Sequence, residues 1–127
     1  MNKKFRPILN FILICAILLI TATACVNQSG SSIYGQWQGV YENDEFIMTF
    51  QKDNTVTLSI LESEYTGTFT LDRSTSPMEL DLTFADLGTI QTIIEFVDEN
   101  TLRFENNSAN IARPTTFSDY ATLTREQ

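Results

Sequence analysis

The seven residues MELDLTF, Met78 to Phe84, decide the fold. Apolar side chains occupy every second position, and two acids and a threonine occupy the positions between them. Successive side chains of a β-strand point to opposite faces, so this alternation is typical of a strand with one face buried and the other in water. We therefore expect Leu80 and Leu82 to point into a core, and Glu79 and Asp81 to point outward.

The same alternation, interrupted by turn residues at short intervals, continues through the rest of the chain. It predicts eight strands, at residues 33–41, 45–51, 55–62, 64–72, 78–84, 90–97, 101–105 and 120–125. Most connections are short, which favours antiparallel hairpins between neighbours in sequence. Eight such strands hide one apolar face and remove their edges by closing into an up-and-down barrel. The prediction is an all-β, eight-stranded antiparallel barrel over residues 33–127, with a two-sheet sandwich as the alternative.

Large aromatic rings crowd the face that we expect to point inward, namely Trp37, Tyr41, Phe46, Phe50, Tyr65, Phe69, Phe84, Phe96 and Phe104. Gly39 and Gly67 lie on the same face, and we expect them to leave gaps between the rings. Eight-stranded barrels are either filled by side chains or hold one small ligand. We therefore expect a shallow apolar pocket at the mouth of the barrel, lined by Tyr41, Tyr65, Phe84 and Phe117. The loops at 42–45, 62–64, 85–89 and 106–116 should gather there, and the opposite, closed end should hold Trp37.

The first 24 residues have the pattern of a secretory signal peptide. Lys3, Lys4 and Arg6 form a basic start, and an apolar run follows at residues 8–20. As a helix this run is about 20 Å long, which is too short for the ~30 Å hydrocarbon core of a bilayer. We therefore interpret residues 1–24 as a signal-peptide helix that is removed from the mature protein.

The signal ends in Thr21-Ala22-Thr23-Ala24-Cys25, which resembles the lipobox of bacterial lipoproteins, except that Ala22 stands where leucine is commonest. The resemblance implies that Cys25 carries acyl chains such as palmitate and begins a flexible polar tether at residues 25–32. It also implies a location in the cell envelope, extracytoplasmic and held to the membrane by this lipid. Ala22-Thr23-Ala24 also fits an ordinary A-x-A cleavage site, so plain secretion is the alternative.

The charge of the mature chain excludes nucleic acid as a partner. The signal takes three of the eight basic residues with it, so five remain against sixteen acidic ones. Such a chain is repelled by phosphate backbones. The chain also has no histidine, which excludes imidazole catalysis and histidine-ligated zinc or haem. We expect a monomer with no cofactor.

Two groups of carboxylates are candidate sites. Glu79 and Asp81 project from one strand face and could mimic the carboxylate pair of a glycosidase, but we expect that face to lie in water. Glu42, Asp44 and Glu45 crowd the first turn, where a loose Ca²⁺ site is the alternative to a solvated acidic turn, and nothing there matches an EF-hand loop. We therefore assign no catalytic residue and no metal site, and we do not expect an enzyme.

Several blocks, taken in order, resemble a largely uncharacterised family of bacterial lipocalin-like domains. Gly35-Gln36-Trp37 is similar to the G-x-W that begins the lipocalin barrel, and further blocks lie at 67–72, 77–82, 98–102 and 113–117. The match departs at Phe69, where the family has tyrosine, and at residues 99–100, where it has a Gly-Asp turn. The resemblance implies an envelope barrel without an assigned activity. It also implies that Gly35, Trp37 and Arg125 close one end, with the guanidinium of Arg125 covering the indole.

Arg113 and Pro114 lie in the longest loop, and we interpret them as structural. Pro114 should set the approach to the last strand, and Arg113 should meet a carboxylate, for which Asp81 is a candidate. Phe117 should cap the barrel. Together these features predict a non-enzymatic, membrane-anchored lipoprotein that binds a small hydrophobic ligand at the cell envelope. The alternative is a structural or protein-interaction module whose barrel is filled by side chains.

Overall fold

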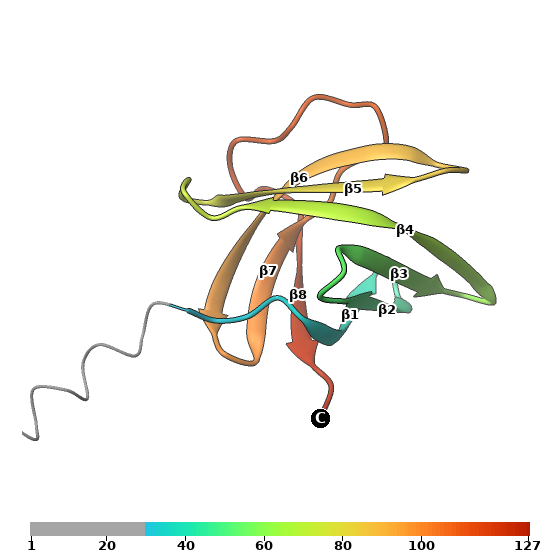
Figure 1. Cartoon of the computed structure of the whole chain (residues 1–127), viewed down its shortest axis with the longest axis horizontal. Coiled ribbons are helices and arrows are strands. Elements are labelled where there is room, and N and C mark those ends of the chain that lie inside the picture. Colours follow the sequence, from blue (N-terminus) through green and yellow to red (C-terminus); the bar gives the residue numbers. More distant parts are fainter. Residues whose placement is uncertain (1–29) are drawn as a thin grey trace, which may run out of the picture. The chain divides into compact units, whose positions relative to one another are not determined.

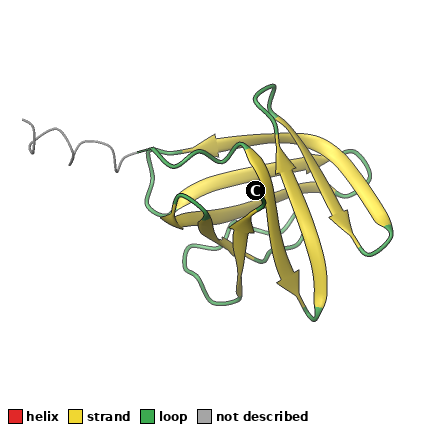
Figure 2. Ribbon diagram, turned by 90° about the horizontal axis from the view of Figure 1, so that it is seen from below, coloured by secondary structure: helices red, strands yellow, loops and turns green. Residues whose placement is uncertain are grey.

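Eight antiparallel strands close into one barrel in a computed structural model that describes residues 30–127 (Figures 1 and 2). Each strand pairs with the next, and β8 pairs with β1. The strands are β1 (Gly35–Tyr41), β2 (Asp44–Phe50), β3 (Thr55–Ile60), β4 (Ser63–Asp72), β5 (Met78–Phe84), β6 (Gly88–Asp98), β7 (Thr101–Glu105) and β8 (Tyr120–Arg125). The predicted barrel is confirmed, and the two-sheet sandwich is wrong.

The segment before the barrel is described only in part. The barrel forms one unit from Ser32 to Gln127. The predicted signal peptide at residues 1–24 and the predicted lipid site at Cys25 lie outside the described residues. Within residues 30–127 there is no helix long and apolar enough to cross a membrane.

The strands lie close to their predicted positions, and β5 has the predicted bounds. β1 begins two residues later than predicted, at Gly35, because Ile33 turns into the core instead of joining the ladder. The indole Nε1–H of Trp37 donates a hydrogen bond of 2.7 Å to the carbonyl oxygen of Ile33. This bond holds the chain entry over the end of the barrel.

The interior of the barrel is filled by alternate side chains of all eight strands. On β5, Leu80 and Leu82 are fully buried while Glu79 and Asp81 keep solvent contact, as predicted. Burying one such side chain stabilises the fold by about 1.5–3 kcal/mol. The buried apolar residues that pack into one cluster are Ile33, Trp37, Phe46, Met48, Phe50, Val56, Phe69, Leu80, Leu82, Phe84, Ile94, Leu102, Phe104, Ala121 and Leu123.

The two interior glycines do not leave the gaps that we predicted. Gly39 lies opposite Phe46 in the β1–β2 ladder, and a Cβ on Gly39 would lie 2.8 Å from the Phe46 ring. Gly67 lies opposite Phe84 in the β4–β5 ladder, and its Cβ would lie 2.9 Å from that ring and 2.1 Å from the carbonyl oxygen of Thr83. Each ring thus occupies the space above the glycine across from it, so the expected gaps are closed.

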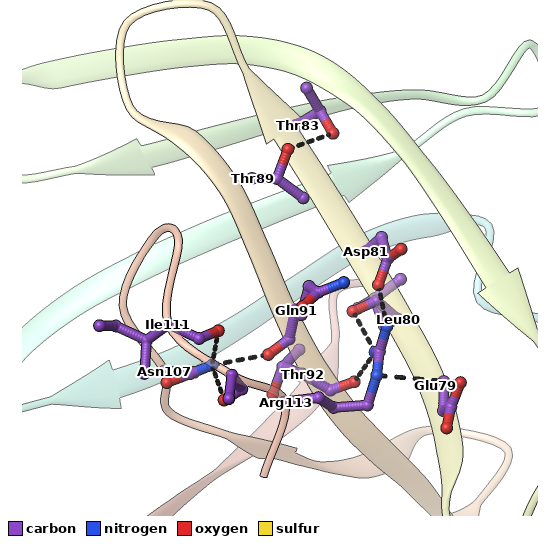
Figure 3. Close-up of polar contacts among 11 residues, drawn as sticks. Glu79, Leu80, Asp81, Thr83, Thr89, Gln91, Thr92, Asn107, Ile111 and Arg113 are labelled. Atoms are coloured by element: carbon purple, nitrogen blue, oxygen red, sulfur yellow. Dashed lines mark hydrogen bonds and ion pairs between the residues drawn. The ribbon is translucent and has the colours of Figure 1, made fainter.

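The long connection between β7 and β8, residues 106–119, lies against the outer wall of the barrel. The side-chain amide of Asn107 donates to the carbonyl oxygen of Gln91 at 2.7 Å, and the backbone N–H of Asn110 donates to that of Thr89 at 2.8 Å. These bonds bring the connection alongside the first half of β6 (Figure 3).

Candidate functional site

The barrel has two ends of different composition. Because neighbouring strands are antiparallel, the turns at 42–43, 61–62 and 85–87 gather at one end, which we name the mouth end. The turns at 51–54, 73–77 and 99–100 gather at the other end, together with the entering residues 32–34, and we name this the tether end. In Figure 1 the β3–β4 and β5–β6 turns lie on the right and the β4–β5 turn on the left.

Arg125 and Trp37 close the tether end. Trp37 is fully buried, and the guanidinium carbon of Arg125 lies 4.2 Å from the centroid of its ring. A guanidinium within about 6 Å of an indole centroid is attracted by the negative face of the ring. The stacking that the lipocalin resemblance implied is therefore present.

The guanidinium of Arg125 also ties together three separate segments. It donates to the carbonyl oxygens of Glu99 at 3.1 Å, Tyr34 at 2.6 Å and Ser32 at 2.5 Å. The β1–β8 ladder pairs only Trp37 with Arg125 and Gln38 with Thr124, whereas the β7–β8 ladder pairs five residues with five. Arg125 thus reinforces the barrel where its strand pairing is shortest.

Gly35 has a structural reason to be glycine at this closure. Its φ of +120° lies in a region that residues with a Cβ rarely adopt. A Cβ there would also lie 3.0 Å from Nη1 of Arg125. The glycine of the G-x-W block therefore gives both the backbone angle and the room that the arginine needs.

A pocket of about 160 Å³ opens at the tether end, beside this closure. Its lining is mixed: Ile33, Tyr34, Phe69 and Leu71 contribute apolar side chains, and Ser32, Asn54 and Arg73 contribute polar ones. The rings of Tyr34 and Phe69 meet edge to face, with centroids 6.5 Å apart. An apolar cavity of roughly 150 Å³ is large enough for one benzene ring. The pocket has room for a single ring or a short alkyl chain.

The four residues predicted to line a pocket at the mouth lie in different surroundings. Phe84 is fully buried across from Gly67, and Tyr65 packs partly against the core. Tyr41 is 38% exposed at the end of β1. The prediction that its ring lies in the interior is therefore wrong. Phe117 is half-buried and packs edge to face against Tyr120 of β8, whose side chain is exposed.

The mouth end carries carboxylates and no basic side chain. Its acids are Glu42, Asp44, Glu45, Glu62, Glu64 and Asp86, whereas the five basic residues of the described chain, Lys52, Arg73, Arg103, Arg113 and Arg125, lie on the tether end or the outer wall. Among residues 30–127, no three Asp, Glu, Cys or His side chains are grouped so that they could hold a metal ion.

Arg113 holds the long connection to β5 and β6. Its guanidinium bonds to the carboxylate of Asp81 and donates to the carbonyl oxygens of Leu80 at 3.3 Å and Thr92 at 2.7 Å. Its Nε lies 3.8 Å from a carboxylate oxygen of Glu79 (Figure 3). The prediction that Arg113 meets a carboxylate is confirmed. Both members of the carboxylate pair weighed as catalytic are thus partners of this arginine.

Glu105 anchors the far end of the same connection, and sequence reasoning missed it. It points outward from β7 yet is only 2% exposed, because its carboxylate accepts hydrogen bonds from the backbone N–H groups of Ser118 and Asp119 and from the Ser118 hydroxyl. Alternation alone predicts water at this position. In the sequence, only the length of the connection at residues 106–119 indicates that this connection covers Glu105.

Two aspartates stabilise turns at the tether end. The side-chain hydroxyl and then the backbone N–H of Thr55 hold the pKa of Asp53 below its usual value. The hydroxyl and backbone N–H of Ser74 lower the pKa of Asp72 in the same way. Both carboxylates favour the charged form because that form accepts these bonds.

The fold and these contacts define the structural class of the protein. It is a closed eight-stranded antiparallel barrel that is filled by its own side chains and closed at one end by Arg125 stacked on Trp37. No protein-family model, curated protein or solved structure matches the chain. The likeness to bacterial lipocalin-like domains therefore rests on the sequence blocks and on the shared barrel topology.

Proposed function

We propose that the protein is a non-enzymatic bacterial lipoprotein, anchored to a membrane of the cell envelope through acyl chains on Cys25. The support is the lipobox-like stretch and the position of Cys25, which is followed by a short polar segment before the barrel begins at Ser32. Two or three acyl chains on one residue give stable anchoring where one chain would be marginal. The barrel then faces the extracytoplasmic side.

The test of the anchor is substitution of the acceptor sulfur. Cys25→Ser should convert a membrane-bound product into a soluble or unprocessed one, whereas Cys15→Ser, within the signal, should leave the product membrane-bound. Mass spectrometry of the wild-type protein should show acyl chains on its first residue. A wild-type protein without acyl chains that partitions into water would contradict the proposal.

We further propose that the barrel binds a small apolar ligand in the pocket at the tether end. The pocket itself carries this proposal: it measures about 160 Å³, its apolar lining residues are Ile33, Tyr34, Phe69 and Leu71, and the polar residues Ser32, Asn54 and Arg73 border them. Ligand pockets of drug-sized molecules measure roughly 300–1,000 Å³, so the ligand, or the part of it that enters, is one ring or a short alkyl chain.

Toluene and indole are suitable probes, and NMR chemical shifts measure their binding. Saturable shifts should appear at Tyr34 and Phe69 and should disappear in Leu71→Phe, which fills the pocket. Val97→Phe, at an exposed site on β6 outside the pocket, is the matched control and should leave the shifts intact. Binding that Leu71→Phe does not change would contradict the proposed site.

A second candidate function is a protein-interaction module, and the filled interior favours it. With Phe46 over Gly39 and Phe84 over Gly67, the barrel offers no lumen at those positions, so contacts with partners fall on its outer surface and ends. Toluene and indole discriminate the two functions. Saturable uptake in the pocket supports the small ligand, and its absence supports the interaction module.

A further inference from the structure

Each of the three short turns of the mouth end has an exposed large apolar residue next to an acid, within the turn or at the end of the strand before it. The pairs are Tyr41-Glu42, Leu61-Glu62 and Asp86-Leu87, and the tether end has one comparable pair, Val97-Asp98 at the end of β6. The apolar members are 38%, 75% and 37% exposed. The tether-end turns at 51–54, 73–77 and 99–100 contain only polar residues and a proline. We name the three pairs the mouth rim.

The three pairs follow one another around the barrel. β2 pairs with β3 and β4 pairs with β5, so the β1–β2 turn neighbours the β3–β4 turn, which in turn neighbours the β5–β6 turn. Gly67 of β4 lies level with Phe84 at the end of β5, so the β3–β4 hairpin, with Leu61 at its tip, continues beyond the β5–β6 turn. Ile111 of the long connection adds an exposed apolar side chain beside β6, where Asn110 bonds to Thr89. The mouth rim therefore suits an elongated partner.

Leu61 is unfavourable for the free protein in two respects. Its φ of +54° is a left-handed conformation that glycine, asparagine or aspartate adopts at lower cost than leucine. Its side chain is also the most exposed of the large apolar residues in the described chain. A residue that costs stability in its backbone and gains none by burial points to a role outside the fold.

The charge of the mouth end selects the partner. Six carboxylates and no basic side chain lie there, so the potential is negative and attracts cations while it repels anions. Anionic lipid headgroups and a second copy of this acidic rim are both repelled. A partner that covers the apolar members and neutralises the acids must present apolar and basic side chains together, as a basic amphipathic helix does.

We propose that the mouth rim is a docking surface for a basic amphipathic segment of a partner protein. Its apolar face covers Leu61, Leu87 and Tyr41, and its Lys or Arg side chains pair with Glu42, Glu62 and Asp86. The rim lies at the opposite end of the barrel from Ser32, the first residue of the barrel unit. The surface is separate from the tether-end pocket, and each proposal can fail without the other.

The test uses the mature protein in phosphatidylcholine nanodiscs and a labelled synthetic helix as the probe. The helix carries leucine at positions i, i+3, i+4 and i+7 with flanking lysines, and fluorescence anisotropy measures binding against empty nanodiscs. Comparison peptides have every lysine replaced by glutamine, or the same residues scrambled so that no apolar face forms. Spermine supplies positive charge without an apolar face.

We expect saturable binding of the basic amphipathic helix, weakened by salt, and little binding of the comparison peptides or of spermine. Leu61→Asn and Leu87→Ser should each weaken it about tenfold, because each removes apolar contact from the centre of the interface. The double variant Glu62→Gln/Asp86→Asn should weaken it and reduce its salt dependence. Val97→Ser, at a site that is 53% exposed near the tether end, should leave binding unchanged.

Several outcomes overturn the proposal. Equal binding of the scrambled peptide or of spermine would show that the acids attract any cation and that no docking surface exists. An equal loss in Val97→Ser would show non-specific apolar adhesion. Absence of binding by wild-type protein would also overturn it. Leu61→Asn should keep the barrel folded, since asparagine suits the turn, so its loss of binding cannot arise from unfolding.

Discussion

The two ends of the barrel are closed by different physical means. At the tether end the guanidinium of Arg125 lies over the indole of Trp37 and donates to three backbone carbonyl oxygens. These bonds join the chain ends where the β1–β8 ladder pairs few residues. Toward the mouth end the closure is apolar and internal, with Phe46 over Gly39 and Phe84 over Gly67. The first closure uses segments far apart in the sequence, and the second uses cross-strand neighbours.

The two ends therefore differ in how much sequence change they tolerate. The rings at the mouth end are below the rim, so the turns above them take no part in closure and are free to carry exposed apolar and acidic residues. The tether end has no such freedom, because residues 32–34, the β6–β7 turn and the end of β8 all meet at one guanidinium. The comparison can be tested by changing each closure in turn.

Gly67→Ala should have the largest effect. Its added methyl group meets the backbone oxygen of Thr83, which cannot move without shifting β5, and we expect a loss of about 3 kcal/mol in the free energy of unfolding. Gly39→Ala meets side chains and no backbone, namely the far edge of the Phe46 ring and a methyl carbon of Leu123, and should cost less, about 1–2 kcal/mol. Urea denaturation measures both. Gly30→Ala is the control, because a Cβ there would have nothing within 4 Å. An equal loss of stability at all three positions would contradict the closure of the mouth end by the Phe46 and Phe84 rings.

Arg125→Ala should come next, with a loss of about 2 kcal/mol from the stacking and the hydrogen bonds together. Arg125→Lys should recover only part of it, because an ammonium group lacks the planar fork that reaches three carbonyls. A double-mutant cycle with Trp37→Phe isolates the stacking. Zero coupling in that cycle would leave the tether end held by hydrogen bonds alone.

Asp81→Ser should cost about 1 kcal/mol, since the ion pair with Arg113 is partly exposed and the arginine keeps two carbonyl partners. The substitution should destabilise the long connection at residues 106–119 and leave both ends of the barrel unchanged. Hydrogen exchange should therefore rise within residues 106–119 while the protection of β1 and β8 stays unchanged. Faster exchange in β1 and β8 would mean that the outer wall and the tether end are coupled.

Leu61→Asn should have an effect of opposite sign, a gain of about 0.5–1 kcal/mol in the free energy of unfolding. Asparagine tolerates the left-handed backbone of this turn, and no packing is lost because the leucine is exposed. Thermal unfolding should show a higher midpoint. A loss of stability would show that Leu61 packs on the barrel and would weaken the case for a docking role.

Acid should affect the turns of the tether end with the smallest change in stability. Asp53 and Asp72 have lowered pKa values in the folded protein, so their contribution is present above the unfolded value of about 4 and is lost as the pH falls through the lower folded values. Asp53→Asn and Asp72→Asn should flatten the change in exchange at these turns below about pH 4. An unaltered pH profile in both variants would assign the acid response to other carboxylates.

Local patterns in the sequence predicted the strands well, because each strand contains its own alternation. Met78–Phe84 is the clearest case, and the positions of Leu80 and Asp81 followed from it. The pairing of Trp37 with Arg125 was predicted from the lipocalin resemblance.

Contacts that depend on register or on distant segments were not predictable in the same way. The Phe46 ring occupies the space above Gly39 only because β1 and β2 pair in one particular register. Periodicity within each strand does not specify that register. The burial of Glu105 and the position of Phe117 depend on the path of residues 106–119, which has no periodic pattern. The tether-end pocket was missed for the same reason, since residues 32–34 were expected to be tether or strand.

The bonds of Arg125 also set the order in which the barrel assembles. They join residues separated by 91 and 93 positions in the chain, and they lie at the seam between the first and last strands. Seven strands can form hairpins before β8 is synthesised, but the seam cannot close until β8 is available. During that interval β1 keeps an unpaired edge that can join with other chains. The slow, long-range step of folding is therefore this closure, and a chain cut short before β8 would be the species most prone to aggregate.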